Sequence, residues 1–242
     1  MSAVAHQLDF EAERRRDLES LYTARFFRRR FAITPRLVEA VSRAIAKEPH
    51  ELSCLYIWGV HAKPAPDAHD DDTISHLHAL LKRMEVHLQV KVILDVLLAD
   101  SHGELNEVAV DRSAPYATGI TRRLEQRGWR VYRMSDLWRN ANITRTSIDE
   151  LGSRLDVVST APRLLLFAGK HYRGTSAERG ARRYLAARLL EQPVVSERFK
   201  GHLLLTPVEP TLDAIQPDMP IMHIWTRKKG CSAKPWFAPE RV

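Results

Sequence analysis

The chain contains little cysteine, little glycine and no long apolar run. Its 242 residues include 2 cysteines and 10 glycines. Two cysteines are too few for a four-thiolate metal site, and the low glycine content excludes collagen-like and low-complexity chains. No apolar stretch approaches the roughly 20 residues that cross a bilayer. Acidic residues, rather than the apolar core of a signal peptide, follow the first methionine. We therefore expect a globular, cytoplasmic protein.

Several signatures of common enzyme classes are also missing. The chain has no G-x-x-x-x-G-K-[ST] phosphate loop, no G-x-G-x-x-G dinucleotide turn, no G-x-S-x-G nucleophile elbow and no H-E-x-x-H zinc helix. These absences argue against P-loop ATPases, NAD enzymes, serine hydrolases and zincins. His76 and His78 lie two residues apart on an expected helix, where their side chains diverge, so we predict no metal site.

Charge is abundant and unevenly distributed. The formal net charge is +7, yet the segment 51–110 is acidic and the segments on either side of it are basic. This division suggests a polyanionic partner for the basic faces and a separate acidic pocket, although charged segments can also be simple solvated surface. The candidate contacts to RNA phosphates lie on two expected helices: Arg122, Arg123, Arg127, Arg182 and Arg183.

Hydrophobic periodicity predicts alternating strands and helices. The expected strands are 52–60, 90–99, 129–134, 164–168, 202–206 and 221–226, and the expected helices are 8–31, 35–47, 70–86, 116–127 and 176–190. We therefore predict a single α/β domain with a doubly wound, mostly parallel, Rossmann-like sheet. Basic helices would occupy residues 1–50, the α/β core 51–226 and a basic tail 227–242.

Acidic and polar residues gather near the expected carboxyl ends of the first two strands, the edge at which ligands bind in such sheets. Carboxylates there would hold a guanidinium or ammonium group by bidentate contact. Three consecutive aspartates could instead cap the helix that they begin. The candidate substrate-binding residues are His61, Asp70, Asp71, Asp72, Asp100, His102, Glu104 and Asn106.

The segment VILDVLLADSHGELN, followed by a helix and then GWRVYRMSDLW, resembles the catalytic domain of tyrosyl-type class I aminoacyl-tRNA synthetases. In that family a strand ends in an L-A-D-x-H-A-x-L-N-like loop that lines the amino-acid pocket. Asp100, His102, Leu105 and Asn106 match that loop. The family's histidine-rich ATP signature is altered here to DTISHLHALLKRM, which has no glycine.

A second resemblance is to the tRNA-dependent cyclodipeptide synthases, which keep this fold without ATP and join two amino acids from aminoacyl-tRNAs into a diketopiperazine. The stretch YLAARLLEQP is similar to a helix of that family, with Glu191 on its catalytic Glu, and IMHIW places His223 on its His. Tyr184 lies one turn before Ala187, which occupies the position of the family's Tyr. His61 replaces the serine of the family's Gly-x-Ser motif.

The resemblance implies an aminoacyltransferase with aminoacyl-tRNAs as partners and no DNA or membrane partner. An aminoacyl ester is already activated, so this chemistry needs no cofactor, only a base for the attacking amine and donors for an oxyanion. The candidate catalytic residues are Glu191, Tyr184, His223 and Ser101, of which Ser101 could replace the missing nucleophilic serine. Glu191 could equally be a structural residue that pairs with Arg188 or Arg198.

One branch of that family makes arginine-containing products, and the acidic pocket suits an arginyl substrate, so we predict Arg-tRNA as one donor. Two alternatives stay open. The first is an ATP-dependent adenylating or nucleotidyl-transferring enzyme of the same fold. The second is a non-catalytic RNA-binding protein derived from a synthetase. The second amino acid and the oligomeric state do not follow from the sequence.

Overall fold

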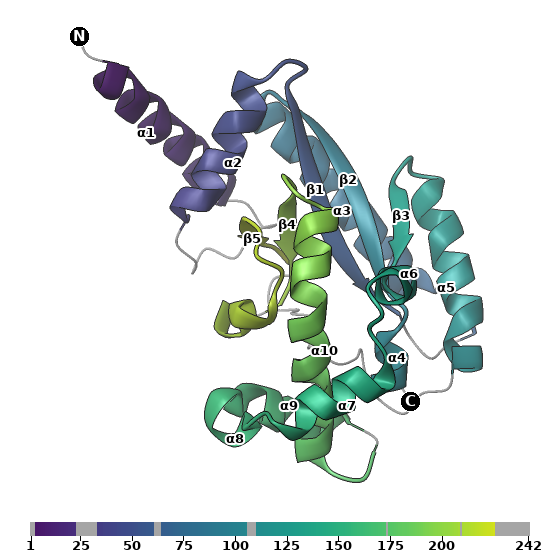
Figure 1. Cartoon of the computed structure of the whole chain (residues 1–242). Coiled ribbons are helices and arrows are strands. Elements are labelled where there is room, and N and C mark those ends of the chain that lie inside the picture. The colour runs from purple at the N-terminus through teal and green to yellow at the C-terminus, as the bar shows by residue number, and fades with distance from the viewer. Residues whose placement is uncertain are drawn as a thin grey trace.

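The computed structural model describes residues 3–22, 33–60, 64–105, 110–172, 174–208 and 210–225. These ranges contain a five-stranded sheet with the order β3-β2-β1-β4-β5, in which every neighbouring pair is parallel (Figure 1). The strands are β1 (Glu51–Gly59), β2 (Lys91–Ala99), β3 (Arg130–Arg133), β4 (Leu203–Thr206) and β5 (Ile221–His223). The predicted parallel Rossmann-like sheet is therefore confirmed.

Helices precede and connect the strands. Before β1 lie α1 (Ala3–Tyr22) and α2 (Pro35–Ala46). Between β1 and β2 lies α3 (Ala68–Leu88), and between β2 and β3 lie α4 (His102–Leu105) and α5 (Val110–Glu125). The long connection from β3 to β4 contains α6 (Met134–Asn140), α7 (Arg145–Ser153), α8 (Val157–Thr160), α9 (Pro162–His171) and α10 (Ala177–Arg198). A 3-10 helix, η1 (Pro210–Ile215), joins β4 to β5.

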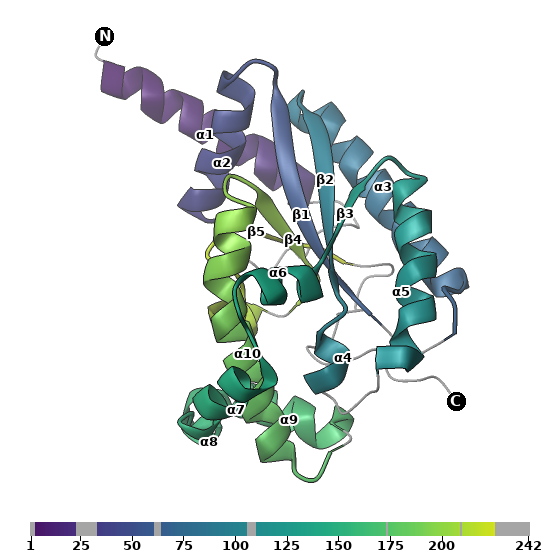
Figure 2. The same ribbon diagram turned by 45° about the vertical axis from the view of Figure 1, so that its right-hand side comes forward.

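Two hydrophobic cores lie on opposite faces of the sheet. Cys54, Tyr56 and Trp58 of β1 pack with α1, α2, α3 and α5, whereas Leu55 packs with α6 to α10. Figure 2 shows α10 across one face of the sheet, with α7, α8 and α9 grouped near its first turns. Because both faces are covered, the parallel strands are apolar on both sides, and their sequences read as continuous apolar runs.

Local sequence signals set several helix ends. The Thr34 side chain accepts a hydrogen bond from the Leu37 amide and caps α2, which begins at Pro35. After α5 the chain turns at Gly128, whose φ of 77° lies in the left-handed region that glycine adopts at low cost. Both predicted helix ends are confirmed.

The expected strand at 164–168 is wrong, because these residues belong to α9. Leu164 and Ala168, four residues apart, are buried, whereas Leu166 between them is 62% exposed. That spacing is helical, and five apolar residues are too short a window to separate helix from strand. The segment after β2, where the synthetase resemblance implied a loop, contains a short helix, α4, and the helices from α6 to α8 were not expected.

Parts of the predicted organisation lie outside the described residues. These are the end of the helix expected at 8–31 and the basic tail at 227–242. Within the described ranges, no helix combines the length and the apolar character needed to cross a bilayer.

Candidate active site

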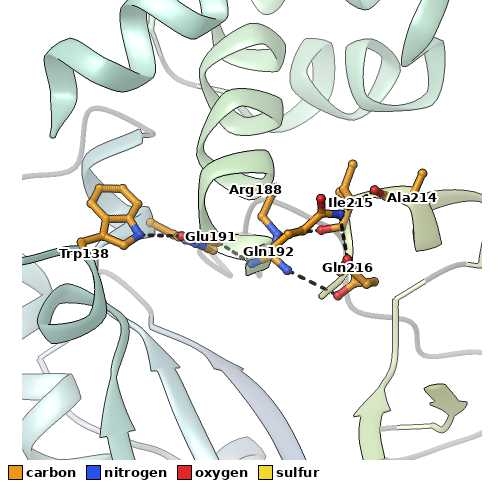
Figure 3. Close-up of polar contacts among 8 residues, drawn as sticks. Trp138, Arg188, Glu191, Gln192, Ala214, Ile215 and Gln216 are labelled. Carbon is orange, nitrogen blue, oxygen red and sulfur yellow. Dashed lines mark hydrogen bonds and ion pairs between the residues drawn. The ribbon is translucent and has the colours of Figure 1, made fainter. Parts of the chain in front are cut away.

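Glu191 is buried in the middle of α10 and accepts hydrogen bonds from three elements. Its side chain is 1% exposed. Nε2 of His102, at the start of α4, lies 2.7 Å from Oε1 of Glu191, and Nε1 of Trp138 on α6 donates to the same oxygen at 2.8 Å. Arg188, one turn earlier on α10, donates to Oε2 at 2.6 Å (Figure 3). Glu191 and His102 are 89 residues apart in the sequence, so the fold alone brings them together.

The partners of Glu191 determine its charge. Burial by itself would raise the pKa of this carboxyl group. Electrostatic attraction to His102 and Arg188, together with the hydrogen bonds from His102 and Trp138, outweighs burial and holds the pKa below its ordinary value. Glu191 is therefore a carboxylate at neutral pH.

Aromatic rings surround the His102 imidazole. The Tyr184 ring meets it edge to face, with 5.8 Å between ring centroids, and the Trp138 ring lies 6.4 Å away. Burial raises the pKa of Tyr184 to about 12, and the Glu191 charge contributes to the rise. The Tyr184 hydroxyl therefore keeps its proton at neutral pH. Tyr184, one turn before Ala187 on α10, therefore lies against the His102 ring.

Arg188 connects Glu191 to the segment after β4. Its guanidinium donates to the Ile215 carbonyl at 3.3 Å and to the Gln216 side chain at 3.4 Å (Figure 3). Gln192, on the same side of α10, donates to the carbonyls of Ala214 and Gln216 at 2.6 and 2.7 Å. These contacts join α10 to the end of η1 and to Gln216, and they position the Arg188 guanidinium that bonds to Glu191.

The two structural alternatives for Glu191 are now decided. Pairing with Arg188 is confirmed. Pairing with Arg198 is wrong, because Arg198 lies over the Tyr132 ring, 5.1 Å from its centroid. A buried ion pair does not exclude a functional role, since a carboxylate needs such partners to stay charged away from water.

A cavity of about 380 Å³ lies beside this cluster, at the carboxyl ends of β2 and β3. Trp138 lines the cavity and also donates to Glu191, so it connects the two. Ser101 lines it as well. This residue is 5% exposed, and its hydroxyl has no hydrogen-bond partner among the described residues. A buried hydroxyl without a partner is uncommon and leaves a group available to a ligand.

The two carboxylates at the cavity already have partners within the chain. Asp100 accepts hydrogen bonds from the amide and the hydroxyl of Ser135, at 2.9 and 2.8 Å. Glu104 pairs with Arg145 at 2.8 Å. Asp100 and Glu104 therefore lie where the sequence placed them, at the strand edge, but part of their charge is balanced by the protein itself.

The aspartates at the start of α3 do not line this cavity. Asp70 is buried, forms a capping box with Asp67 and accepts a hydrogen bond from the Tyr116 hydroxyl at 2.9 Å. Asp71 pairs with Arg123 at 2.5 Å, and Asp72 is exposed. The helix-capping alternative is confirmed for Asp70, and substrate binding by the three aspartates stays a prediction.

His223 lies at the end of β5, in contact with η1. Its Nδ1 faces the Val208 carbonyl at 3.1 Å, and its Nε2 faces Asp213 Oδ2 at 3.2 Å. Both partners are hydrogen-bond acceptors. None of these contacts involves Glu191, so the structure does not join these two predicted catalytic residues directly.

Two predicted substrate-binding residues, His61 and Asn106, lie outside the described residues.

The predicted RNA-binding arginines fall into two groups. Arg183 is buried and pairs with Asp149 of α7 at 2.9 Å, a contact within the protein that competes with its expected contact with RNA. Arg123 bonds to the start of α3, and the half-buried Arg182 pairs with Glu178 at 2.6 Å. Arg122, in the last turn of α5, and Arg127, in the turn that follows it, are exposed and remain candidates.

Sequence reasoning missed Trp138, Gln192 and Gln216 as members of this site. The position of Trp138 in the quoted segment GWRVYRMSDLW was the one available signal, because the last residues of that segment follow the expected strand at 129–134 and so approach the ligand edge. Gln192 and Gln216 carry no comparable signal, since their contact depends on how α10 packs against η1.

Solved structures give the wider relationship. The chain is similar to the PvcA protein from Pseudomonas aeruginosa, with a TM-score of 0.64 and 14% identity over 92% of this chain and 86% of that one. It is also similar to tyrosyl-tRNA synthetase from Archaeoglobus fulgidus, solved with L-tyrosine, with a TM-score of 0.50 and 14% identity over 88% of this chain and 63% of that one. The fold is tyrosyl-tRNA-synthetase-like. A third similar structure is cyclo(L-leucyl-L-phenylalanyl) synthase, with a TM-score of 0.43 and 14% identity over 80% of this chain and 95% of that one.

At the level of sequence, neither a family model nor a curated protein matches the chain. With identities of 14%, these similarities establish the synthetase-like fold and leave the reaction to be argued from the site.

Proposed function

We propose that this protein is an aminoacyltransferase that joins two aminoacyl groups from aminoacyl-tRNAs into a cyclodipeptide. The contact between His102 and Glu191 carries this proposal. The first residue belongs to the segment that resembles the synthetase amino-acid loop, and the second to the helix that resembles the cyclodipeptide synthases. Two resemblances, carried by different segments of the chain, therefore meet at one buried site beside a cavity.

The site has the groups that this reaction needs. An amine that attacks an ester must lose a proton, and the oxygen of the tetrahedral intermediate needs a hydrogen-bond donor. The imidazole of His102, in contact with the Glu191 carboxylate, provides proton-transfer chemistry, and the protonated Tyr184 hydroxyl is a donor. The aminoacyl ester brings its own activation, so the proposed reaction requires no cofactor.

The partner in this proposal is tRNA. Arg122 and Arg127 are exposed in the last turn of α5 and in the turn that follows it, on a chain whose formal net charge is +7. Contacts from such residues to phosphates hold RNA without reading its sequence. The arginyl substrate predicted from the sequence would use Asp100 and Glu104, the acidic residues of the cavity, and would compete with Arg145 for Glu104.

The test is mass spectrometry of the small molecules formed when the purified protein meets a mixture of charged tRNAs without ATP. We expect cyclodipeptides that disappear when the tRNAs are first treated with ribonuclease, and their masses identify the amino acids. A product that forms only with ATP would support the adenylating alternative. RNA binding without any product would support the non-catalytic one.

A pair of variants makes this test specific to the site. Glu191→Gln should abolish the product. Glu150→Gln makes the same chemical change at an exposed position of α7 and should leave product formation unchanged. Full activity of Glu191→Gln would show that the reaction does not depend on the contact between His102 and Glu191, and would contradict the proposal.

A further inference from the structure

We propose that His102 is the residue that moves the proton in this reaction, and that Glu191 is a positioning residue that orients the His102 ring. This inference rests on the proposed function, but the hydrogen-bond geometry on which it depends can be measured without any substrate.

The hydrogen bond fixes the tautomer of His102. Oε1 of Glu191 already accepts the Trp138 indole N–H at 2.8 Å and belongs to an ionised carboxylate, so it accepts from His102 as well. Nε2 of His102 must therefore carry the hydrogen. In the neutral ring this leaves the lone pair on Nδ1.

Nδ1 is the available atom of the cluster. No described residue forms a hydrogen bond to Nδ1. Nδ1 is also not one of the buried atoms without a partner, so it is accessible to solvent. The His102 side chain is 12% exposed, compared with 1% for Glu191. Its chain neighbour Ser101 and its ring partner Trp138 both line the cavity, which brings the cavity close to the imidazole, although His102 is not itself a lining residue.

Glu191, by contrast, is poorly placed to accept a proton. Its two oxygens accept hydrogen bonds from His102, Trp138 and Arg188. Protonation would break at least one of these bonds and leave the buried Arg188 charge without its partner. A carboxylate that orients an imidazole and stabilises its cationic form is an established division of labour between such groups.

The proton transfers balance over one bond-forming step. The α-amine of one aminoacyl group forms a bond to the ester carbon of the other, and its proton passes to Nδ1 of His102. The ester C–O bond then breaks, and its electron pair stays on the ribose oxygen. Nδ1 returns the proton to that oxygen, which restores the tRNA hydroxyl and the neutral imidazole. The Glu191 charge stabilises the imidazolium between the two transfers.

The first test is nitrogen NMR of the histidine rings in the free protein, which needs no substrate. We expect His102 in its neutral form to be the Nε2–H tautomer. The double variant Arg188→Met/Glu191→Gln removes the carboxylate without leaving a buried unpaired cation, and it should mix the two tautomers. Arg188→Met alone keeps the bond between His102 and Glu191, so it should keep the single tautomer. An Nδ1–H ring in the unmodified protein would overturn the inference.

The second test is product formation from charged tRNAs. His102→Ala should lower the rate by about 10²–10⁴-fold, the usual contribution of general acid–base catalysis. Added imidazole should restore part of the rate, which a purely structural role would not allow. His87→Ala, on α3 across the sheet, is the matched control and should have no effect. Full activity of His102→Ala, or of the better-tolerated His102→Gln, would overturn the inference.

The two tests separate the two proposals. If the unmodified protein forms no cyclodipeptide but His102 is the Nε2–H tautomer, the proposed function fails and the orienting role of Glu191 stands. If product forms and His102→Ala retains it, the proposed function stands and the role of His102 fails.

Discussion

At the residue scale, the charge of Glu191 is balanced inside the protein by Arg188. Both side chains are almost completely buried, at 1% and 3% exposed, and their contact is 2.6 Å. Breaking such a pair by removing one partner leaves a charge that neither water nor protein compensates. The same pair therefore contributes to the stability of the fold and to the chemistry of the site.

A double-mutant cycle measures this coupling. Arg188→Met and Glu191→Gln should each lower the free energy of unfolding by about 3–5 kcal/mol, because each leaves its partner buried and unpaired. The double variant should lose less than the sum of the two, because neither charge is then left alone. Urea unfolding of the four proteins provides the values. Additive losses would contradict the proposed coupling.

The lowered pKa of Glu191 also predicts a pH dependence of stability. Its pKa in the folded protein lies below the ordinary value of 4.5, so the stability that it contributes is present above that value. This contribution is lost as the pH falls below 4.5 and through the folded pKa. Urea unfolding between neutral and acidic pH should show a steeper loss for the unmodified protein than for Arg188→Met/Glu191→Gln. Equal losses would show that Glu191 has an ordinary pKa.

At the element scale, α9 offers a direct comparison of helix and strand. Leu164 is buried in the core beneath α10, whereas Leu166 is exposed, although both would share one face of a strand. Leu164→Ala should cost about 2–5 kcal/mol of unfolding free energy, and Leu166→Ala less than about 0.5 kcal/mol. Thermal or urea unfolding of the two variants checks this. Similar costs would favour the strand that the apolar run suggested.

The sequence predicted the strands and the long helices better than the short helices. The parallel strands β1 and β2 read as continuous apolar runs, and α2 was marked by Thr34 and Pro35. The helices α6, α7 and α8 span 7, 9 and 4 residues, which is shorter than the window in which helical periodicity can be recognised. Their positions depend on packing against α10 and β3, which no local pattern records.

The candidate site was predictable in part for a similar reason. Glu191, His102 and Tyr184 were each singled out by a resemblance, but their contact spans 89 residues of chain and required the fold. Asp70 illustrates the opposite case. Its charge suggested a residue that binds a ligand, whereas in the structure its carboxylate accepts hydrogen bonds from the Asp67 amide and the Tyr116 hydroxyl. Charge patterns show where carboxylates are, and tertiary contacts decide which of them are free.

At the scale of the whole molecule, the arginines divide into those that serve the fold and those that face solvent. Arg122→Ala with Arg127→Ala should weaken binding to tRNA and make that binding less dependent on salt, by about 0.7–0.9 in the slope of log K against log salt for each lost phosphate contact. Titrations at several salt concentrations measure the slope. An unchanged slope would place the RNA elsewhere.

Arg183→Ala is the matched variant for this experiment. Its guanidinium pairs with Asp149 between α10 and α7, so its loss should lower stability and leave the salt slope unchanged under conditions in which the protein is folded. A lower slope for this variant would mean that α10 contributes to RNA binding after all.

The measurement that tests the central claim most directly follows the origin of the atoms in the product. Charged tRNAs carrying ¹³C-labelled amino acids are mixed with the protein, without ATP and with an excess of unlabelled free amino acids. We predict cyclodipeptides in which both amino-acid units carry the label, because both come from tRNA esters. An unlabelled product, or none, would contradict the assignment of this site to aminoacyl transfer.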